Sequence, residues 1–229
     1  MQVRQLFDGD SSTYTYLVWD PPSRCAALID PVLEQVDRDL TLVEELGLTL
    51  VHVLETHVHA DHVTAAGLLR ERTGALCCAG QHGAPCADRH LVHGDAVRLG
   101  ESTITALATP GHTDDGLSYR IAGAVFTGDT LLVRGCGRTD FQNGDAGQLH
   151  DSITRILFAL PDETIVYPGH DYRGQTASTI GEEKRWNCRI AGRDRDAFIA
   201  AMADLRLPPP RRLAEAVPAN RACGSPPAS

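Results

Sequence analysis

Alternating and continuous apolar runs predict β-strands early in the chain. The stretch TYTYLVW (13–19) alternates around its tyrosines, and CAALID (25–30) is short, apolar and closed by an Asp-Pro turn. The stretch LTLVHVLETH (48–57) is almost continuously apolar before its polar end, which is typical of a buried strand. We expect an antiparallel start to the fold, followed by a buried strand.

A different spacing, of three and four residues, marks the segment between these strands. Its apolar positions are Leu33, Val36, Leu40, Val43 and Leu46. This period predicts an amphipathic helix, and Gly47 stands where a helix commonly ends. A second, short helix is expected in VTAAGLLRERTG (63–74), directly after the polar end of the buried strand.

The second half of the chain repeats the order of strands followed by helices. Strands are predicted at 102–109, 117–122, 124–129 and 164–169, with helices at 147–160, 178–188 and 194–205. This order implies an α+β fold in which helices cover both outer faces of two packed sheets. We expect one domain over 1–229 that is helical from about residue 175. Because proline cannot continue a helix, the proline-rich residues 218–229 are expected to form a flexible tail.

Composition and charge exclude several classes of protein. The chain has 229 residues, of which 42% are hydrophobic, enough for a substantial core. Its formal net charge of -9 comes from scattered acidic residues, which argues against a nucleic-acid partner. No signal-like start or membrane-length apolar run is found, so we expect a soluble cytoplasmic protein. A negatively charged substrate would need local positive charge.

The 7 cysteines form no C-x-x-C pair. Their odd number and irregular spacing argue against a disulfide framework or a cysteine zinc cluster. We therefore expect reduced thiols.

Four metal-ligand side chains crowd the loop after the third predicted strand. In ETHVHADHVTAAG (55–67), His57, His59, Asp61 and His62 lie within six residues. Burying so many lone pairs without a cation would cost several kcal/mol for each unsatisfied group, roughly. Ligand sites of α/β sheets are usually found on such loops. The cluster predicts a metal site.

Further candidate ligands follow other predicted strands, mostly after a glycine. They are His112 in TPGHTDDG, Asp129 in FTGDT, and His170 with Asp171 in YPGHDY. Glycine lets the backbone turn sharply, so the next side chain can project from the sheet edge. One histidine alone is usually structural, but so many in the same position predict loops that converge on one site.

The order and spacing of these candidate ligands resemble those of a known superfamily. The pattern T-H-x-H-x-D-H (56–62), followed by His112, Asp129 and His170, resembles the metallo-β-lactamase superfamily. Within it, RGCGRTDFQNGD (134–145), YPGHDYRGQTASTIGEEKRWN (167–187) and LPPPRRLAEAVPANRACG (207–224) resemble the persulfide dioxygenases, so the likeness runs nearly end to end. The resemblance implies an αββα sandwich of two mixed sheets, with the metal at the edge where they meet. It also implies oxidation of glutathione persulfide by dioxygen to sulfite and glutathione.

The resemblance further implies one Fe(II) held by His57, His112 and Asp129. Two histidines and a carboxylate on one face of iron leave positions open for persulfide and dioxygen. The remaining groups are His59, Asp61, His62 and His170. In hydrolase relatives they help to build a two-zinc site. In a one-iron enzyme they would orient the ligands through hydrogen bonds.

Substrate contacts are expected from the two signature stretches. Arg138 is the first candidate for binding a glutathione carboxylate, and Arg173 is the second. A guanidinium binds a carboxylate through two parallel hydrogen bonds. The alternative for either is a surface ion pair. Tyr172 can hydrogen-bond to a group on iron or simply pack. For Cys136, a small apolar filler is favoured over a sulfur relay.

Two other functions stay open at this point. A glyoxalase II-like thioester hydrolase would use two metals and a bridging hydroxide. A metal-dependent persulfide sensor would bind thiols without turnover. The family resemblance also implies a homodimer.

Overall fold

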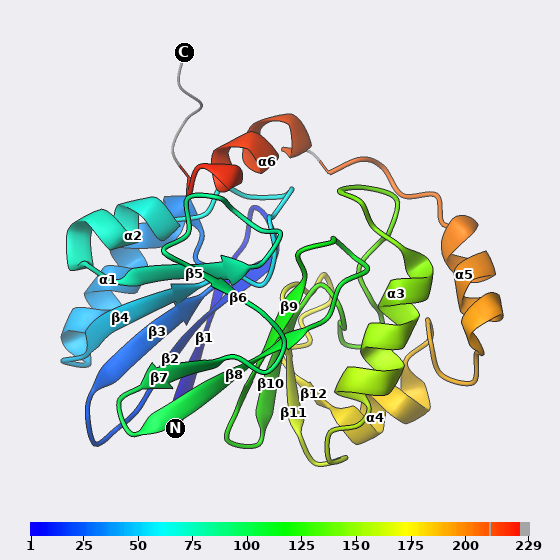
Figure 1. Cartoon of the computed structure of the whole chain (residues 1–229), viewed down its shortest axis with the longest axis horizontal. Helices are drawn as coiled ribbons and strands as arrows, with labels where there is room; N and C mark the ends of the chain where they lie inside the picture. The colour runs from blue at the N-terminus through cyan, green and yellow to red at the C-terminus, as the bar shows by residue number, and fades with distance from the viewer. Residues whose placement is uncertain (211, 225–229) are drawn as a thin grey trace.

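Two mixed β-sheets packed face to face form the centre of the molecule (Figure 1). The computed structural model describes residues 1–210 and 212–224. In the first sheet β1, β2 and β3 are antiparallel, and β3 to β6 are parallel. Its strands, in spatial order, are β1 (Gln2–Asp8), β2 (Thr13–Trp19), β3 (Cys25–Ile29), β4 (Thr49–Leu54), β5 (Leu76–Gly80) and β6 (Arg89–Leu91).

The second sheet is antiparallel except for the parallel pair of β10 and β11. Its strands, in spatial order, are β12 (Ser178–Thr179), β11 (Ile165–Pro168), β10 (Ala124–Gly128), β9 (Leu117–Ile121), β8 (Ser102–Ala108) and β7 (Ala96–Leu99). Each half of the chain therefore supplies one sheet.

Helices cover the outer faces of both sheets, as Figure 1 shows. On the first sheet lie η1 (Leu33–Gln35), α1 (Val36–Glu45) and α2 (Ala66–Thr73). On the second lie α3 (Ala146–Asp151), its π-helical continuation η2 (Ser152–Leu157), α4 (Ile180–Trp186) and α5 (Arg195–Ala203), while α6 (Leu213–Arg221) returns to the first half of the molecule. The expected α+β fold, an αββα sandwich, is confirmed. Among the described residues, no helix combines the length and apolar character needed to cross a bilayer.

Side chains of β2 alternate between two apolar layers, so the strand is buried on both faces. Tyr14, Tyr16 and Val18 point between the sheets, whereas Leu17 packs with the layer that contains α1 and α2. The fully buried Tyr16 contacts Phe126 of the opposite sheet edge-on, at 4.9 Å between ring centroids. Its hydroxyl donates to the Pro168 carbonyl at 2.6 Å, so no polar group is left unpaired. Burying a ring such as Phe126 stabilises the fold by roughly 1.5–3 kcal/mol.

The predicted strands and helices match the structure to within a few residues, with some exceptions. The pattern gave no prediction for β1, β5, β6 or β7. Residues 178 and 179, expected in a helix, form β12, and the helix starts at Ile180. The helix that ends near Gly47 is confirmed, and Gly47 has a left-handed φ of 59°.

Two predictions about cysteines and the C-terminal residues are wrong. Cys86 and Cys223 form a disulfide, although the odd cysteine count suggested reduced thiols. The predicted tail from residue 218 instead continues α6 through Pro218 to Arg221. Packing of Ala216 and Ala219 against Val63 holds this segment and overrides the helix-breaking tendency of proline. Residues 225–229 of the predicted tail lie outside the described residues.

Candidate metal centre

A cavity of about 550 Å³ opens at one edge of the sandwich, where loops from both sheets meet. Its polar lining includes Asp61, His112, Asp129 and His170. These side chains come from the loops that follow β4, β8, β10 and β11. The sequence predicted this convergence from the strand ends, and the structure brings the loops together.

His57, His112 and Asp129 each offer one ligand atom, and these atoms all lie within 4.8 Å of one another. Two glycines, each directly before one of these ligands, allow the backbone to pass close to neighbouring atoms. Gly128 has a φ of 48°, and a Cβ there would lie 2.5 Å from Thr56 Oγ1. Gly111 has a φ of 132°, and a Cβ there would lie 2.2 Å from the Leu149 nitrogen. No side chain fits at either position, so glycine lets both loops reach the site.

A buried relay fixes the tautomer of His57. The Thr56 hydroxyl donates to Asp30 Oδ2 at 2.7 Å, because a carboxylate only accepts. Its oxygen is then free to accept from His57 Nδ1, 2.9 Å away. His57 therefore carries its proton on Nδ1 and keeps the lone pair of Nε2 free for a metal. A carboxylate that orients a histidine in this way is common behind metal ligands.

His112 is held in the same tautomer by a backbone group. Its Nδ1 lies 2.6 Å from the carbonyl oxygen of Arg138, which can only accept. The free Nε2 lies 3.6 Å from Asp129 Oδ2. The other oxygen, Asp129 Oδ1, accepts from His170 Nδ1 at 2.6 Å. Two imidazole lone pairs and one carboxylate oxygen thus face a common point, a donor set that suits a divalent metal.

The protonation states favour metal binding. Burial lowers the pKa of His57 well below its usual value, and the neighbouring His59 and His112 lower it further, so the ring stays neutral. Burial alone would raise the pKa of Asp129, but the charge and hydrogen bond of His170 lower it below its usual value. The site therefore presents a neutral His57 imidazole and an ionised Asp129 carboxylate near pH 7.

His170 lies between two carboxylates and offers no lone pair. Its Nδ1 donates to Asp129 and its Nε2 lies 2.9 Å from Asp61 Oδ2. Burial would lower the pKa of His170, but Asp129 and Asp61 raise it well above its usual value. Asp61 Oδ2 also accepts from His62 Nδ1 at 2.8 Å and from the Thr13 hydroxyl at 3.0 Å. These groups form a hydrogen-bonded layer behind the candidate ligands.

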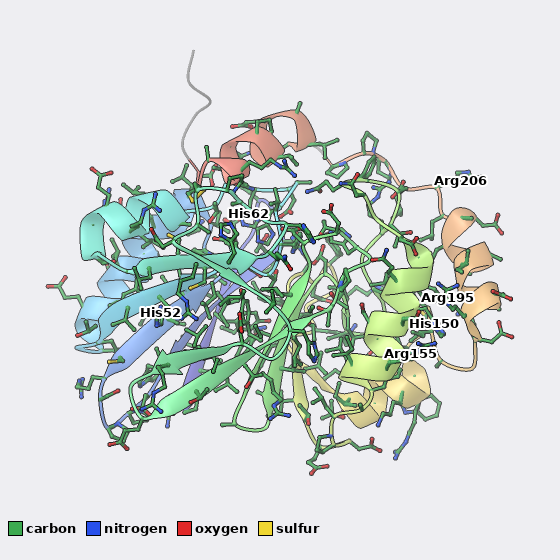
Figure 2. All side chains as sticks on the ribbon, viewed as in Figure 1. His52, His62, His150, Arg155, Arg195 and Arg206 are labelled. Atoms are coloured by element: carbon green, nitrogen blue, oxygen red, sulfur yellow. A yellow bond between two sulfur atoms is a disulfide. The ribbon has the colours of Figure 1, made fainter. Side chains whose placement is uncertain are left out.

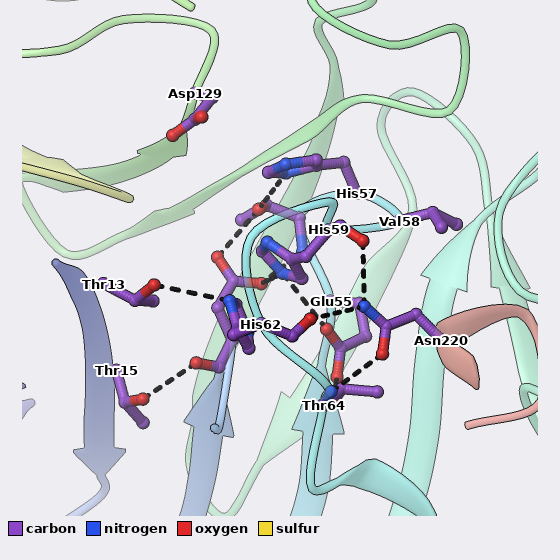
Figure 3. Close-up of polar contacts among 12 residues, drawn as sticks. Thr13, Thr15, Glu55, His57, Val58, His59, His62, Thr64, Asp129 and Asn220 are labelled. Atoms are coloured by element: carbon purple, nitrogen blue, oxygen red, sulfur yellow. Dashed lines mark hydrogen bonds and ion pairs between the residues drawn. The ribbon is translucent and has the colours of Figure 1, made fainter. Parts of the chain in front are cut away.

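A second group of donors lies beside the first, and Figure 3 shows two of its members, His59 and His62, next to His57. Ligand atoms of His59, Asp61 and His62 lie within 4.8 Å of one another. The buried His62 Nε2 has no hydrogen-bond partner among the described residues. His59 Nε2 approaches Asp30 Oδ1 at 3.1 Å and Glu55 Oε2 at 3.3 Å. Burial would lower the pKa of His59, but the Asp30 and Glu55 carboxylates raise it well above its usual value.

Residues from distant elements hold the loop after β4 that carries His57, His59, Asp61 and His62 (the ligand loop), and the sequence did not predict them. Asp115 accepts from the Val58 nitrogen at 2.8 Å. Gln142 donates to the Val58 carbonyl at 2.6 Å, and Asn220 reaches the same loop from α6. Asp30, whose carboxylate anchors Thr56, was predicted only as part of an Asp-Pro turn. Its position directly after a strand was the one available signal.

Arg138 lines the cavity but its guanidinium is largely occupied. It binds both Asp140 oxygens at 2.6 and 2.7 Å, and donates to the Pro208 and Leu207 carbonyls at 2.7 and 3.3 Å. These contacts use four of the five N–H groups of an arginine. Arg173 is exposed and is not part of the cavity lining.

Tyr172 and Cys136 both line the cavity, with different surroundings. Tyr172 is 74% exposed, and its ring stacks on His170 at 6.2 Å between centroids. The Cys136 sulfur lies 4.0 Å from that of Met202, and burial raises the pKa of its thiol to about 12. A protonated thiol is a poor nucleophile, which favours the filler interpretation of Cys136.

Comparisons with known proteins place this geometry in context. The family model described as "Metallo-beta-lactamase superfamily" matches residues 8–85 and 87–170. A mouse protein named "Persulfide dioxygenase ETHE1, mitochondrial" is 44% identical, over 97% of this chain and 88% of its own. The crystal structure of ETHE1 from Myxococcus xanthus is 63% identical with a TM-score of 0.97, covering 98% of this chain and 100% of that one. A hydroxyacylglutathione hydrolase of Rhodospirillum rubrum is 41% identical over 71% of this chain and 63% of its own.

Proposed function

The chain belongs to the metallo-β-lactamase superfamily, and we propose that within it this protein is a glutathione-dependent persulfide dioxygenase. It converts glutathione persulfide, dioxygen and water into glutathione and sulfite. The observation that carries the proposal is the likeness to ETHE1 proteins along nearly the whole chain, including the α5 and α6 region. A likeness to an enzyme over 97% of the chain also favours catalysis over the sensor considered from the sequence.

The donor set fits one iron. His57 Nε2, His112 Nε2 and one Asp129 oxygen are the atoms proposed to hold Fe(II), and the relay from Asp30 and the Arg138 carbonyl turn both imidazoles toward it. Two histidines and a carboxylate are the usual ligands of iron oxygenases. A bound ferrous ion would supply electrons that activate dioxygen beside the terminal sulfur of the persulfide.

The surrounding side chains orient the proposed ligands and can donate hydrogen bonds to the substrate. His170 keeps Asp129 ionised and turns its second oxygen toward the ligand group. The exposed Tyr172 ring borders the cavity beside His170, where its hydroxyl can donate to a substrate oxygen or sulfur. We propose that His59, Asp61, His62 and His170 act through hydrogen bonds around a single metal.

Arg138 is proposed to act on the substrate side of the cavity. Because Asp140 and two carbonyls occupy most of its donors, it can offer one N–H to a carboxylate and otherwise holds residues 207 and 208 as a cavity wall. Arg173 lies outside the lining, so it would meet only a substrate group that extends beyond the cavity.

A thioester hydrolase with two metals is the second candidate. The donor group of His59, Asp61 and His62 and the partial likeness to a hydroxyacylglutathione hydrolase favour it. Against it, both nitrogens of His170 already bind carboxylates and Asp61 Oδ2 accepts three hydrogen bonds. Those groups would have to release their partners to bind a second ion.

Metal content and oxygen consumption separate the two functions. Iron-loaded protein should consume oxygen with glutathione persulfide and release sulfite, and it should contain one iron per chain. Hydrolysis of an S-acyl glutathione with two metals bound and no oxygen uptake would refute the proposal in favour of the hydrolase.

Single substitutions then test the ligands. His57→Ala, His112→Ala and Asp129→Ala should each lose iron and activity. His52→Ala is the matched control, because His52 lies on β4 away from the loop (Figure 2) and its ring contacts the Arg98 carbonyl at 3.0 Å. Full iron content in the Asp129 variant would contradict the ligand assignment.

Two finer expectations stay predictions. A homodimer is implied by the family resemblance and is measured by light scattering. The cytoplasmic location was predicted from the sequence, whereas the mouse relative is named as mitochondrial. Imaging of the tagged native protein in its own cells tests this.

A further inference from the structure

The primary amide of Asn220 joins α6 to the loop that carries the candidate ligands (Figure 3). Its Nδ2 donates to the carbonyls of His59 and His62 at 2.9 and 2.8 Å, and its Oδ1 accepts from the Thr64 nitrogen at 2.8 Å. The residue is only 3% exposed. An amide has two donors and one acceptor oxygen, so this side chain satisfies three backbone groups of one loop. It fixes the path of the backbone between His59 and Thr64.

The residues after Asn220 are packed closely on the same region. The Gly67 nitrogen donates to the Cys223 carbonyl at 2.8 Å. A Cβ on Gly67 would lie 2.6 Å from that carbonyl oxygen, and one on Gly224 would lie 2.0 Å from the Thr64 carbonyl oxygen. Backbone therefore lies directly on backbone where Cys223 meets Gly67 of α2 and where Gly224 meets Thr64.

The Cys86–Cys223 disulfide fixes this end of α6 to the loop between β5 and β6. The two cysteines are 137 residues apart in the chain. The carbonyl of Cys86 is also bound, by Arg70 of α2 at 2.9 Å. The disulfide thus connects the first half of the molecule to the helix that carries Asn220.

We propose that Asn220 is a positioning residue for the ligand loop, and that the Cys86–Cys223 disulfide holds it in place as a reversible thiol-dependent lock on the metal centre. The oxidised protein keeps the loop in the binding geometry. The reduced protein lets the end of α6 move away, so the backbone of residues 59–64 loosens and the metal dissociates faster.

The redox step is a thiol–disulfide exchange with glutathione. A glutathione thiolate attacks the sulfur of Cys86, the more exposed residue of the pair, and Cys223 leaves as a thiolate that takes up a proton. A second glutathione thiolate then attacks the mixed disulfide. The products are two protein thiols and one glutathione disulfide, with two electrons passed to the protein. Glutathione is a product of the proposed dioxygenase reaction, and only this choice of reductant rests on that function.

Hydrogen–deuterium exchange of the full-length, metal-free protein tests the loop directly. A phosphine reductant should speed exchange of the backbone amides at residues 59–64 in the wild type and leave the double variant Cys86→Ser/Cys223→Ser unchanged. The double variant itself should exchange like the reduced wild type. Equal exchange in oxidised and reduced wild type would overturn the proposal, whether or not the protein is a dioxygenase.

The rate of metal release measures how far the position of this loop affects metal binding. Loss of a direct hydrogen-bond partner of a metal ligand typically costs 10–100-fold in affinity. Asn220 acts one step further out, through the backbone of His59 and His62 beside His57, so Asn220→Asp should release Co(II) or Fe(II) to a chelator several-fold faster. The aspartate keeps the acceptor for Thr64 but repels the two carbonyls. The visible spectrum of the Co(II) protein should also shift in this variant. A general loss of stability would not change that spectrum.

A stability-matched control completes the test. Val43→Ala removes buried methyl groups in α1, in the layer outside the first sheet, without touching the loop. It should lower the melting temperature but leave the Co(II) spectrum and the release rate unchanged. If Asn220→Asp releases metal no faster than Val43→Ala, Asn220 does not position the loop and the proposal fails.

Discussion

Thr56→Val is the sharpest test of how the fold prepares a metal ligand. Valine has nearly the shape of threonine, so the substitution removes one hydroxyl from a buried site without leaving a cavity. That hydroxyl donates to Asp30 Oδ2 at 2.7 Å and accepts from His57 Nδ1 at 2.9 Å. After the change, Asp30 Oδ2 and the His57 Nδ1 proton both lose a partner.

The expected losses of stability and of metal affinity follow from these two contacts. A buried polar group left without a partner costs about 1–3 kcal/mol, and here two groups are affected. Freeing the His57 ring from its orienting bond should weaken metal binding by about 10–100-fold. In free energy that loss is about 1.4–2.8 kcal/mol. Thr56→Val should therefore lower both the stability of the metal-free protein and its affinity for iron.

Thr56→Ser is the matched control, since serine keeps the hydroxyl and loses only a methyl group. Urea unfolding of the metal-free proteins gives the stability term, and competition with a calibrated chelator gives the iron affinity. The relay would be refuted if Thr56→Val bound iron within about twofold of Thr56→Ser, a difference of about 0.4 kcal/mol.

Three further predictions address other parts of the site. Gly128→Ala should fold poorly and bind iron weakly in a chelator assay, because its Cβ would lie 2.5 Å from Thr56 Oγ1; normal binding would contradict this. Burial would lower the pKa of His170 but carboxylates raise it well above the usual value, so its stabilising effect is complete below about pH 6.5 and is lost as pH rises through the folded pKa. In urea unfolding of metal-free protein, the advantage of wild type over His170→Gln should therefore shrink as the pH is raised, and an advantage that grows would contradict the assignment. Arg138→Ala should raise the Michaelis constant more than it lowers kcat and leave iron content unchanged, whereas loss of iron would give Arg138 a role in the metal site.

Periodicity and turn residues predicted most of the fold because those signals are local. The tyrosines of β2 recur at every second position because one face of the strand lies between the sheets, and the apolar spacing of α1, which ends just before Gly47, marks its buried face. The strands β1 and β5 carry no such signal. Gln2–Asp8 is a half-exposed edge strand, and LCCAG is short, with cysteines where β-branched residues are common.

The convergence of the ligand loops was predictable because strand ends share an edge, but the contacts that orient the ligands were not. Asp30 and Asn220 reach the loop across 26 and 156 residues of sequence. No local pattern specifies such pairs, because they depend on how distant elements pack. The Cys86–Cys223 disulfide was missed for the same reason, since spacing alone does not pair cysteines. Pro218 continues a helix because tertiary contacts outweigh local propensity.

The division of the two sheets between the two halves of the chain has a consequence for biogenesis. His57 leaves the sheet built by the first half, whereas His112 and Asp129 leave the sheet built by the second. Neither half alone presents all of His57, His112 and Asp129, so this set of donors forms only after both sheets have docked. Metal uptake by these three residues then reports that folding has reached the stage at which the two halves meet.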